Sequence, residues 1–269
     1  MDTLSEYQYF CQKVQQLTGF DLSSYKPNQM VRRLGTLMGR NRVSSFTEYF
    51  RLLERDAERR REFIDFLTIN VSEFFRNPGR FDFLKERVIT ELAAGGTELK
   101  VWSAGCSTGE EPYSVAMILD ELGVLDRAQI HATDVDEQAL EQAAGGWYEP
   151  LPLRNVSTGR LDRYFFRDGD NYRVVDRIRQ AVSFRRHDLL KDAYGSGYDL
   201  ILCRNVVIYF TESSKERIYR LFRAALKPGG YLFTGGTETI LGARELGLTS
   251  VSPCFYRKAT GTAPREGRK

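Results

Sequence analysis

The segment Lys100–Ser114, KVWSAGCSTGEEPYS, constrains the fold of this chain more than any other stretch. An apolar, strand-like run ends at a loop that contains Gly105 and Gly109, and a helix start follows at Glu110–Pro112. Glycine lets the backbone pass close to a ligand, and proline is tolerated in a first helical turn because its missing N–H has no partner there. A strand, a glycine loop and a helix N-terminus in this order form the nucleotide-binding corner of a doubly wound α/β sheet.

The same loop narrows the class of ligand. Its glycines are spaced G-x-x-x-G, whereas the dinucleotide-binding fingerprint is G-x-G-x-x-G. Glu110 and Glu111 stand at the helix start, where a pyrophosphate would otherwise bind. Carboxylates there repel phosphate and suit a cationic ligand. The segment therefore favours S-adenosylmethionine over NAD or ATP.

Two regions of the chain differ in their apolar pattern. Residues 1 to about 95 show helical spacing throughout, which predicts a helical hairpin or small bundle. From Leu99 onwards short apolar runs alternate with amphipathic segments, as in βαβ units around a parallel sheet covered on both faces. The expected strands are Leu99–Ser103, Gln129–Thr133, Val182–Arg185, Tyr198–Cys203, Gly230–Thr234 and Cys254–Arg257, and the expected helices are Glu110–Leu122, Glu137–Ala144 and Ser213–Leu226.

One segment interrupts this alternation. Within Tyr164–Val182, aromatic and β-branched residues flank the turn-like Asp168–Asn171, a pattern typical of a β-hairpin. We therefore expect a helical domain over residues 1–75 and an α/β domain over residues 76–258 with a β-subdomain at about 164–182. Residues 259–269 contain only small and charged residues, which predicts a disordered tail.

Composition excludes several classes of protein. No apolar run approaches the ~20 residues that a bilayer crossing needs, and the start MDTLSEYQYF lacks the features of a signal peptide. The four cysteines form no C-x-x-C pair and the chain has two histidines, so no metal site is expected. Thiols without partners suit a reducing compartment. We expect a cytoplasmic protein that does not insert into a membrane.

Charge is distributed unevenly near the N-terminus. Between Asp21 and Glu48 there is no acidic residue, and the net charge of +3 is too small to indicate nucleic acid by itself. Such a stretch either draws in an acidic partner or is simply a solvated helix face. The basic residues in the gap are Lys26, Arg32, Arg33, Arg40 and Arg42.

Polar residues follow two of the expected strands. An acid at the end of the second strand accepts hydrogen bonds from ribose hydroxyls in this architecture, which favours Asp134. Asp136 suits the cap of the next helix, because a cap comes immediately before the helix. Arg204 and Asn205 end the fourth strand and emerge at its carboxyl edge, and Tyr209 lies just beyond them.

A further polar segment precedes the sheet. Ser72 is a candidate helix cap, and the acidic residue nearest to Arg76 is Glu73, at the i,i+3 spacing of a weak helix pair. Spacing alone assigns Arg76 no catalytic role.

Several of these segments together resemble the CheR family of chemotaxis receptor methyltransferases. The resemblance covers nearly the whole chain, and TGFDLSSYKPNQMVRRL is similar to the family's helical substrate-recognition domain. The segments that carry it are, in order, NVSEFFRN, VWSAGCSTGEEPYS, ATDVDEQAL, CRNVVIYF and LKPGGYLF.

The resemblance implies a Rossmann-like, S-adenosylmethionine-dependent methyltransferase sheet with an N-terminal all-helical domain and a small β-subdomain. It implies methyl transfer to glutamate side chains in the cytoplasmic helical region of bacterial chemotaxis receptors, giving γ-glutamyl methyl esters and S-adenosylhomocysteine. Arg76 and Tyr209 would lie near the transferred methyl, and Arg32 and Arg33 are the expected receptor contacts. The cofactor contacts it implies are Asn70, Ser72, Arg76, Glu111, Asp134, Asp188, Leu189, Arg204 and Asn205.

This chain departs from the family at a few positions. Some members have threonine at the position of Ser72 and asparagine at the position of Asp188. Members that bind a pentapeptide at the receptor C-terminus carry extra glycines in the β-subdomain. The turn Asp168–Asn171 lacks those glycines, so tethering through that peptide is not expected.

Two other functions are compared with the sequence at this point. Methyltransferases that act on nucleic-acid base amines resemble one another in an (Asp/Asn)-Pro-Pro-(Tyr/Phe) segment, whereas this chain has Arg204–Val207 there and no proline. The alternative from another class is a regulatory module that binds S-adenosylmethionine or receptors without catalysis. The joint presence of Arg76, Asn205 and Tyr209 with the two acids of the cofactor site argues against a decayed site.

Overall fold

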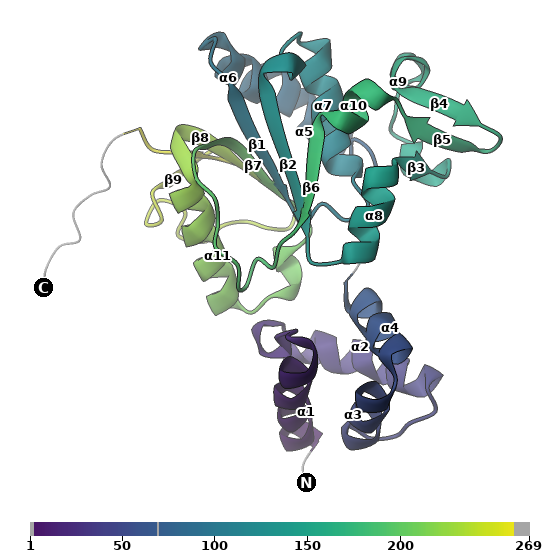
Figure 1. The fold of residues 1–269 in the computed structure, drawn as a ribbon. Coiled ribbons are helices and arrows are strands. Elements are labelled where there is room, and N and C mark those ends of the chain that lie inside the picture. Colours follow the sequence, from purple (N-terminus) through teal and green to yellow (C-terminus); the bar gives the residue numbers. More distant parts are fainter. Residues whose placement is uncertain (1–2, 69, 261–269) are drawn as a thin grey trace, which may run out of the picture. The chain divides into compact units, whose positions relative to one another are not determined.

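The computed structural model describes residues 3–68 and 70–260, which divide into two compact units (Figure 1). Residues up to 68 and the segment Val207–Arg217 form the first unit. Asn70–Val206 and the residues from Ile218 onwards form the second unit. Of the tail expected to be disordered, residues 261–269 lie outside the described part of the chain.

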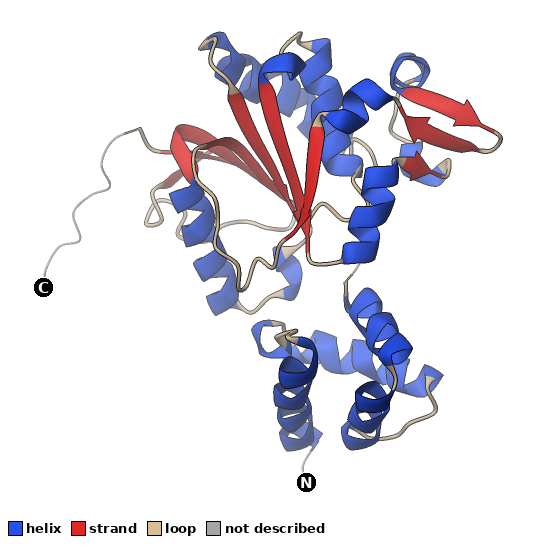
Figure 2. Ribbon diagram, viewed as in Figure 1, coloured by secondary structure: helices blue, strands red, loops and turns tan. Residues whose placement is uncertain are grey.

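The second unit is built on a seven-stranded sheet with the strand order β6-β2-β1-β7-β8-β10-β9 (Figure 2). Strands β6, β2, β1, β7 and β8 are parallel, and β10 is antiparallel to both of its neighbours. The predicted doubly wound sheet is confirmed, and its switch point lies between β1 and β7, where ligands bind at the carboxyl ends of strands. The strands are β1 Leu99–Ala104, β2 Ala128–Asp134, β6 Val182–Arg186, β7 Tyr198–Cys203, β8 Leu226–Thr234, β9 Leu248–Ser252 and β10 Phe255–Lys258.

Helices of the second unit pack against this sheet. The first ten residues of α7 are all buried, and α7 contacts β1, β2 and β6. Burial of all six residues of β7 explains why most of that strand is a run of apolar residues. The helical elements are α5 Pro78–Phe83, η2 Leu84–Ile89, α6 Thr90–Ala94, α7 Glu110–Glu121, η3 Leu125–Arg127, α8 Glu137–Gly145, η4 Leu151–Leu153, α9 Thr158–Tyr164, α10 Asp176–Gln180 and α11 Glu212–Ala225.

A small antiparallel sheet, β3-β5-β4, forms the β-subdomain. The predicted hairpin is confirmed by β4, Phe165–Asp168, and β5, Asn171–Val174. The third strand, β3 at Trp147–Tyr148, was not predicted, because two residues carry no periodicity.

The first unit is helical, as predicted. Ser45 and Asp56 cap α3 and α4, because their side chains accept hydrogen bonds from N–H groups of the first turns. Its core is aromatic, with Phe10 stacked on Tyr49 at 6.0 Å between ring centroids. The elements are α1 Thr3–Thr18, η1 Leu22–Ser24, α2 Pro27–Arg40, α3 Phe46–Arg55, α4 Ala57–Leu67 and η5 Val207–Tyr209. Across residues 3–68 and 70–260, no helix combines the length and the apolar character needed to span a membrane.

Candidate cofactor site at the carboxyl edge of the sheet

The glycine loop after β1 is closely packed. The Gly105 N–H donates to the Thr133 carbonyl at 2.8 Å, which ties the loop to the end of β2. At Gly105, φ is +81°, and an added Cβ would lie 2.4 Å from Cγ2 of Val206. At Gly109, φ is +94°, and an added Cβ would lie 2.9 Å from Cβ of Ala143. Both positions therefore exclude any side chain, because the protein packs closely against the loop and the backbone is left-handed there.

Asp134 lies at the end of β2 beside this loop. One carboxylate oxygen accepts from the Ser107 N–H at 2.8 Å and the other from the Asp136 N–H at 3.1 Å. Each carboxylate oxygen accepts about two hydrogen bonds, so Asp134 keeps capacity for ligand hydroxyls. Burial raises the pKa of Asp134 above its ordinary value of 3.8, against the effect of these backbone N–H groups. The prediction that Asp136 caps the next helix is confirmed, since it accepts from Gln138 N–H at 3.0 Å and Ala139 N–H at 3.1 Å.

The segment before α5 closes over the loop. The Asn70 side chain donates to Asp136 at 2.6 Å and accepts from the Ser107 hydroxyl at 3.1 Å. Ser72 does not cap a helix, which corrects that expectation: it lies in irregular chain, and its hydroxyl hydrogen-bonds the buried carboxylate of Glu110. Both residues thus contact the glycine loop or the helix start after it.

Asp188 and Leu189 follow β6, the strand next to β2. The Asp188 carboxylate accepts from the Leu190 N–H at 2.8 Å and lies 3.6 Å from the Lys191 ammonium. Leu189 is buried. The two residues therefore form a local turn at the same sheet edge as Asp134.

Glu111 and Arg204 form a buried pair at the ends of α7 and β7. Glu111 accepts from the Ser103 hydroxyl at 2.8 Å, and its other oxygen lies 3.4 Å from Nη1 of Arg204. Burial raises the pKa of the Glu111 carboxyl, and the charge of Arg204 opposes that shift. Nη2 of Arg204 donates to the Arg76 carbonyl at 2.7 Å and to Oδ1 of Asn77 at 3.0 Å. The guanidinium of Arg204 is therefore already engaged by groups of the protein.

Asn205 presents an acceptor without a partner. It adopts a left-handed φ of 61°, and its N–H donates to Glu238 at 2.8 Å. Its side-chain Oδ1 is buried, and no group within the described ranges hydrogen-bonds it. Buried polar atoms are nearly always satisfied, so this oxygen points to a ligand that donates hydrogen bonds. The next residue, Val206, closes over Gly105.

Arg76 and Tyr209 differ in what holds them. Arg76 is partly exposed, and its Nη1 donates to the Val71 carbonyl at 3.2 Å. No carboxylate in residues 3–68 or 70–260 pairs with it. Tyr209 belongs to the first unit, where its carbonyl accepts from the Lys26 N–H at 2.9 Å.

The two predicted receptor contacts lie on α2. Arg32 is exposed. Arg33 is half-buried, its guanidinium donates to the Phe66 carbonyl, and the guanidinium carbon lies 4.9 Å from the Phe66 ring centroid. Arg33 thus helps to hold α4 against α2, whereas Arg32 presents its charge to solvent.

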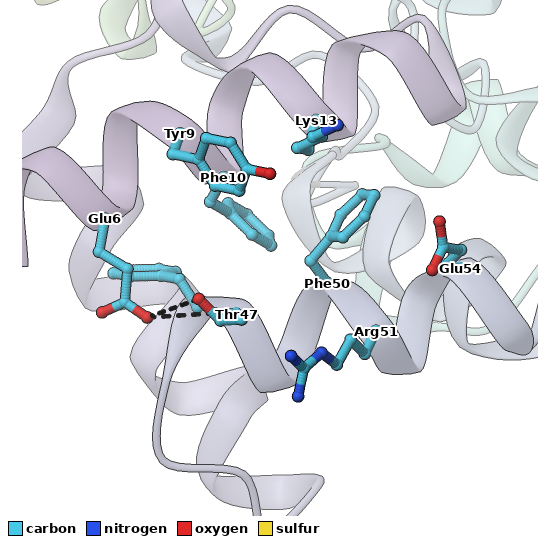
Figure 3. A pocket seen from close by; sticks show the side chains of 9 residues that line it. Glu6, Tyr9, Phe10, Lys13, Thr47, Phe50, Arg51 and Glu54 are labelled. Atoms are coloured by element: carbon cyan, nitrogen blue, oxygen red, sulfur yellow. Dashed lines mark hydrogen bonds between the residues drawn. The ribbon is translucent and has the colours of Figure 1, made fainter.

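A hollow of about 270 Å³ lies in the first unit, and none of the residues that line it is a predicted site residue (Figure 3). Two acidic side chains, two basic side chains and several aromatic rings line it. Glu6 accepts a hydrogen bond from the N–H of Thr47 at 3.2 Å, which links α1 to α3. We assign it a packing role rather than the cofactor. It is lined by Glu6, Tyr9, Phe10, Lys13, Phe46, Thr47, Phe50, Arg51 and Glu54.

Comparison with known proteins decides the family. Residues 5–68 match the family model "CheR methyltransferase, all-alpha domain", and residues 70–252 match "CheR methyltransferase, SAM binding domain". The chain belongs to the CheR methyltransferase family. The resemblance read from the sequence is confirmed, and S-adenosylmethionine is the cofactor of this CheR methyltransferase.

Named relatives agree along the whole length of the chain. The chain is 41% identical over 258 residues to the chemotaxis protein methyltransferase of Listeria monocytogenes, covering 96% of this chain and 98% of the relative. It is 38% identical to chemotaxis protein methyltransferase 1 of Pseudomonas aeruginosa, covering 88% of this chain and 90% of the relative. The protein is therefore an S-adenosylmethionine-dependent methyltransferase of chemotaxis.

The sheet edge of this CheR methyltransferase fits its cofactor. S-adenosylmethionine offers hydrogen-bond donors in its ammonium and ribose hydroxyls and carries a positive sulfonium. The edge offers acceptors and negative charge: the carboxylates of Glu111 and Asp134, and the unpartnered Oδ1 of Asn205. Gly105 and Gly109 give the loop beside these acceptors the tight, left-handed turns that side chains would exclude.

Sequence reasoning missed one residue of this edge. Glu238 is buried in the loop after β8 and accepts from the N–H groups of Asn205 at 2.8 Å and Gly235 at 2.6 Å. It fixes the backbone on which Asn205 sits. The sequence pattern that indicated Asp134, an acidic residue near the end of a strand, could also have indicated Glu238.

Proposed function

We propose that this protein transfers a methyl group from S-adenosylmethionine to glutamate side chains in the cytoplasmic helical region of bacterial chemotaxis receptors. The products are γ-glutamyl methyl esters and S-adenosylhomocysteine. Family membership supports methyl transfer in chemotaxis. The observation that supports a carboxylate as the methyl acceptor concerns Arg76. Its guanidinium is partly exposed near the cofactor residues, and no carboxylate of the described chain neutralises it. Its planar fork matches an incoming carboxylate.

Methyl transfer to a carboxylate does not require the protein to move a proton. A glutamate has a reference pKa of about 4.3 and is already ionised at neutral pH, so no general base is needed. Cys106 and Cys203, the thiols near this edge, are not bases, because burial raises the pKa of both well above the usual value. When bound, the cofactor supplies an electrophilic methyl group on a sulfonium.

The residues of the chain therefore have to position the acceptor and keep water out. Alignment of reacting groups can offset several kcal/mol, up to ~7–11 in the best cases. We propose that Arg76 orients the carboxylate and that Tyr209 orients it more gently, since very tight binding of the ground state would slow transfer. In the same proposal Asp134 receives the ribose hydroxyls and Asn205 the amino-acid end of the cofactor.

The partner is proposed from charge. Arg32 is exposed on α2 in a stretch without acidic residues, which suits the acidic surface of a receptor. Arg33 contributes to the same positive field although its guanidinium contacts Phe66. The turn Asp168–Asn171 lacks additional glycines, so we propose direct recognition of receptors without a pentapeptide tether. We place this activity in the cytoplasm, without nucleic acid and without membrane insertion.

A labelling experiment tests the proposal. The full-length protein is incubated with methyl-labelled S-adenosylmethionine and receptor cytoplasmic fragments. We expect label on receptor glutamates that is released as methanol by mild base, because methyl esters hydrolyse and methylated amines do not. Base-stable label, or label on another residue type, would reject the carboxylate acceptor. Binding of both partners without any label would favour the non-catalytic module.

A further inference from the structure

The segment that carries Arg76 has a strained backbone. Phe75 and Asn77, on either side of Arg76, have φ values of 50° and 63°. These left-handed conformations are uncommon for residues other than glycine, and they persist only where the surroundings fix them. Contacts with the rest of the protein must therefore fix this backbone. These contacts also determine the position from which the Arg76 side chain extends.

Hydrogen bonds from three directions hold the segment. The Phe75 N–H donates to the Ser114 hydroxyl at 3.0 Å, and the Phe74 N–H donates to the Pro152 carbonyl at 3.0 Å. Nη2 of Arg204 donates to the Arg76 carbonyl and to Oδ1 of Asn77. Through this one nitrogen, Arg204 hydrogen-bonds both Arg76 and the left-handed residue that follows it, Asn77.

Arg204 is in turn held by two aromatic rings and a buried acid, while its buried Nε has no hydrogen-bond partner among the described residues. Its guanidinium carbon lies 4.5 Å from the ring centroid of Phe233 and 5.2 Å from that of Phe81. Its Nη1 lies 3.4 Å from the Glu111 carboxylate, and the side chain is buried. The two rings also contact each other, at 5.9 Å between centroids, so the guanidinium lies against an aromatic pair and beside a buried acid, which restricts its orientation.

We propose that Arg204 is a positioning residue, which clamps the backbone of Arg76 and Asn77 and so aims Arg76 at the acceptor carboxylate. Glu111 supports the clamp because its carboxylate lies 3.4 Å from Nη1 of Arg204. The pair thus acts on methyl transfer through Arg76, not only through the cofactor. This inference rests on the proposed function, in which Arg76 meets the acceptor.

The first test is Arg204→Lys. A lysine keeps the charge but has a single nitrogen, so it cannot bond the Arg76 and Asn77 oxygens from one nitrogen while a second nitrogen faces Glu111, as the planar guanidinium does. We expect turnover to fall about 100-fold, as for a small misplacement of a catalytic group. We expect unchanged affinity for S-adenosylhomocysteine by calorimetry, and amide hydrogen exchange over residues 74–77 about tenfold faster. Arg160→Lys is the matched control: Arg160 stacks on the Phe75 ring at 4.1 Å and pairs with Glu121 but bonds no backbone group of the segment.

A second pair of variants keeps the test independent of the folding of Arg204→Lys. Asn77→Gly removes the accepting Oδ1 while tolerating the left-handed φ, and Asn77→Asp keeps an acceptor oxygen there. We expect Asn77→Gly to lower turnover without changing cofactor affinity, and Asn77→Asp to restore it. Equal turnover in both variants would overturn the clamp.

The outcomes separate this inference from the proposed function. If Arg204→Lys weakens cofactor affinity as much as turnover and leaves exchange over 74–77 unchanged, Arg204 is a cofactor contact and the clamp is wrong, while glutamate methylation stands. If Arg76→Ala retains full turnover, the role of Arg76 fails whatever Arg204 does.

Discussion

The two residues proposed to lie near the transferred methyl are held in different ways. Arg76 belongs to the second unit, where buried side chains from α7 and from the residue after β7 bond its segment. Tyr209 belongs to the first unit, where the backbone of Ser24–Lys26 holds it: the Thr211 N–H donates to the Ser24 carbonyl, and the Lys26 N–H to the Tyr209 carbonyl, both at 2.9 Å. Arg204 and Tyr209 are near neighbours in sequence, yet each belongs to a different unit.

Because the two residues have different supports, the aim of Arg76 and the placement of Tyr209 can be altered separately by mutation. Changes around Arg204 should alter the aim of Arg76, and changes around Tyr25 should alter the placement of Tyr209. The Tyr25 ring contacts the Phe210 ring at 4.9 Å and the Phe20 ring at 5.3 Å, so it fastens the segment to the helical core. Five changes, from the largest expected effect to the smallest, test what each unit contributes to the proposed reaction.

Removal of Arg76 should have the largest effect. Arg76→Ala removes the fork that orients the acceptor, and we expect turnover to fall about 100- to 1,000-fold, the range seen when one preorganised donor is lost. Affinity for S-adenosylhomocysteine should change far less. The measurement is steady-state methyl transfer beside calorimetry, with Arg80→Ala, a partly exposed arginine on α5, as the control. Comparable loss in the control would point to a general effect of charge.

Asp134 should control cofactor affinity and its pH dependence. Because burial raises its pKa above 3.8, the carboxyl takes up a proton at a higher pH than an exposed aspartate does. Hydroxyl donors bind the ionised form, so cofactor affinity should be highest above the raised pKa and fall as the pH drops through it. Asp134→Asn should weaken binding by about 1.5–3 kcal/mol at neutral pH and flatten this profile. An unchanged pH profile by calorimetry would remove the ribose role.

Tyr209→Phe tests the residue held by the first unit. Loss of one hydroxyl hydrogen bond should lower turnover by about 0.5–1.5 kcal/mol of activation free energy, which is up to tenfold. Cofactor affinity should not change, because Asp134 and Asn205 lie in the second unit. Normal turnover would contradict the role.

Tyr25→Ala tests the support of Tyr209. The variant loses two ring contacts, each worth about 0.5–1.5 kcal/mol, so the first unit should be less stable to urea and turnover should fall severalfold. Tyr9→Ala is the control, because Tyr9 is 52% exposed at the hollow of Figure 3 and does not touch this segment. A variant with full turnover and normal exchange at Thr211 would show that Tyr25 does not place Tyr209.

The smallest effect is expected for Arg32→Glu. Exposed ion pairs contribute about 0.2–1 kcal/mol, so the Michaelis constant for receptor fragments should rise a fewfold at low salt and approach the wild-type value at high salt. Cofactor affinity should be unaffected. A salt-independent change would favour the reading of this stretch as a solvated helix face.

Much of the fold could be predicted because buried parallel strands are continuous apolar runs, and all six residues of β7 are buried. Two strands were missed for physical reasons. β3 has two residues, and β9, Leu248–Ser252, is an edge strand with three exposed residues, so neither produces an apolar run.

The site was predictable where its residues follow strand ends, as Asp134 and Asn205 do. The engagement of Arg204 by Arg76 and Asn77 was not predictable, because it joins residues more than a hundred positions apart. The attachment of Tyr209 to the first unit depends on backbone hydrogen bonds. Any residue type can form such bonds, so the amino-acid sequence does not indicate them.

Hydrogen exchange on matched variants tests the independence of the two supports most directly. Amide exchange is followed over residues 74–77 and 207–211 in Arg204→Lys and in Tyr25→Ala. The account predicts faster exchange over 74–77 only in the first variant and over 207–211 only in the second. If either variant loosens both segments together, Arg76 and Tyr209 share one support and the central claim is wrong.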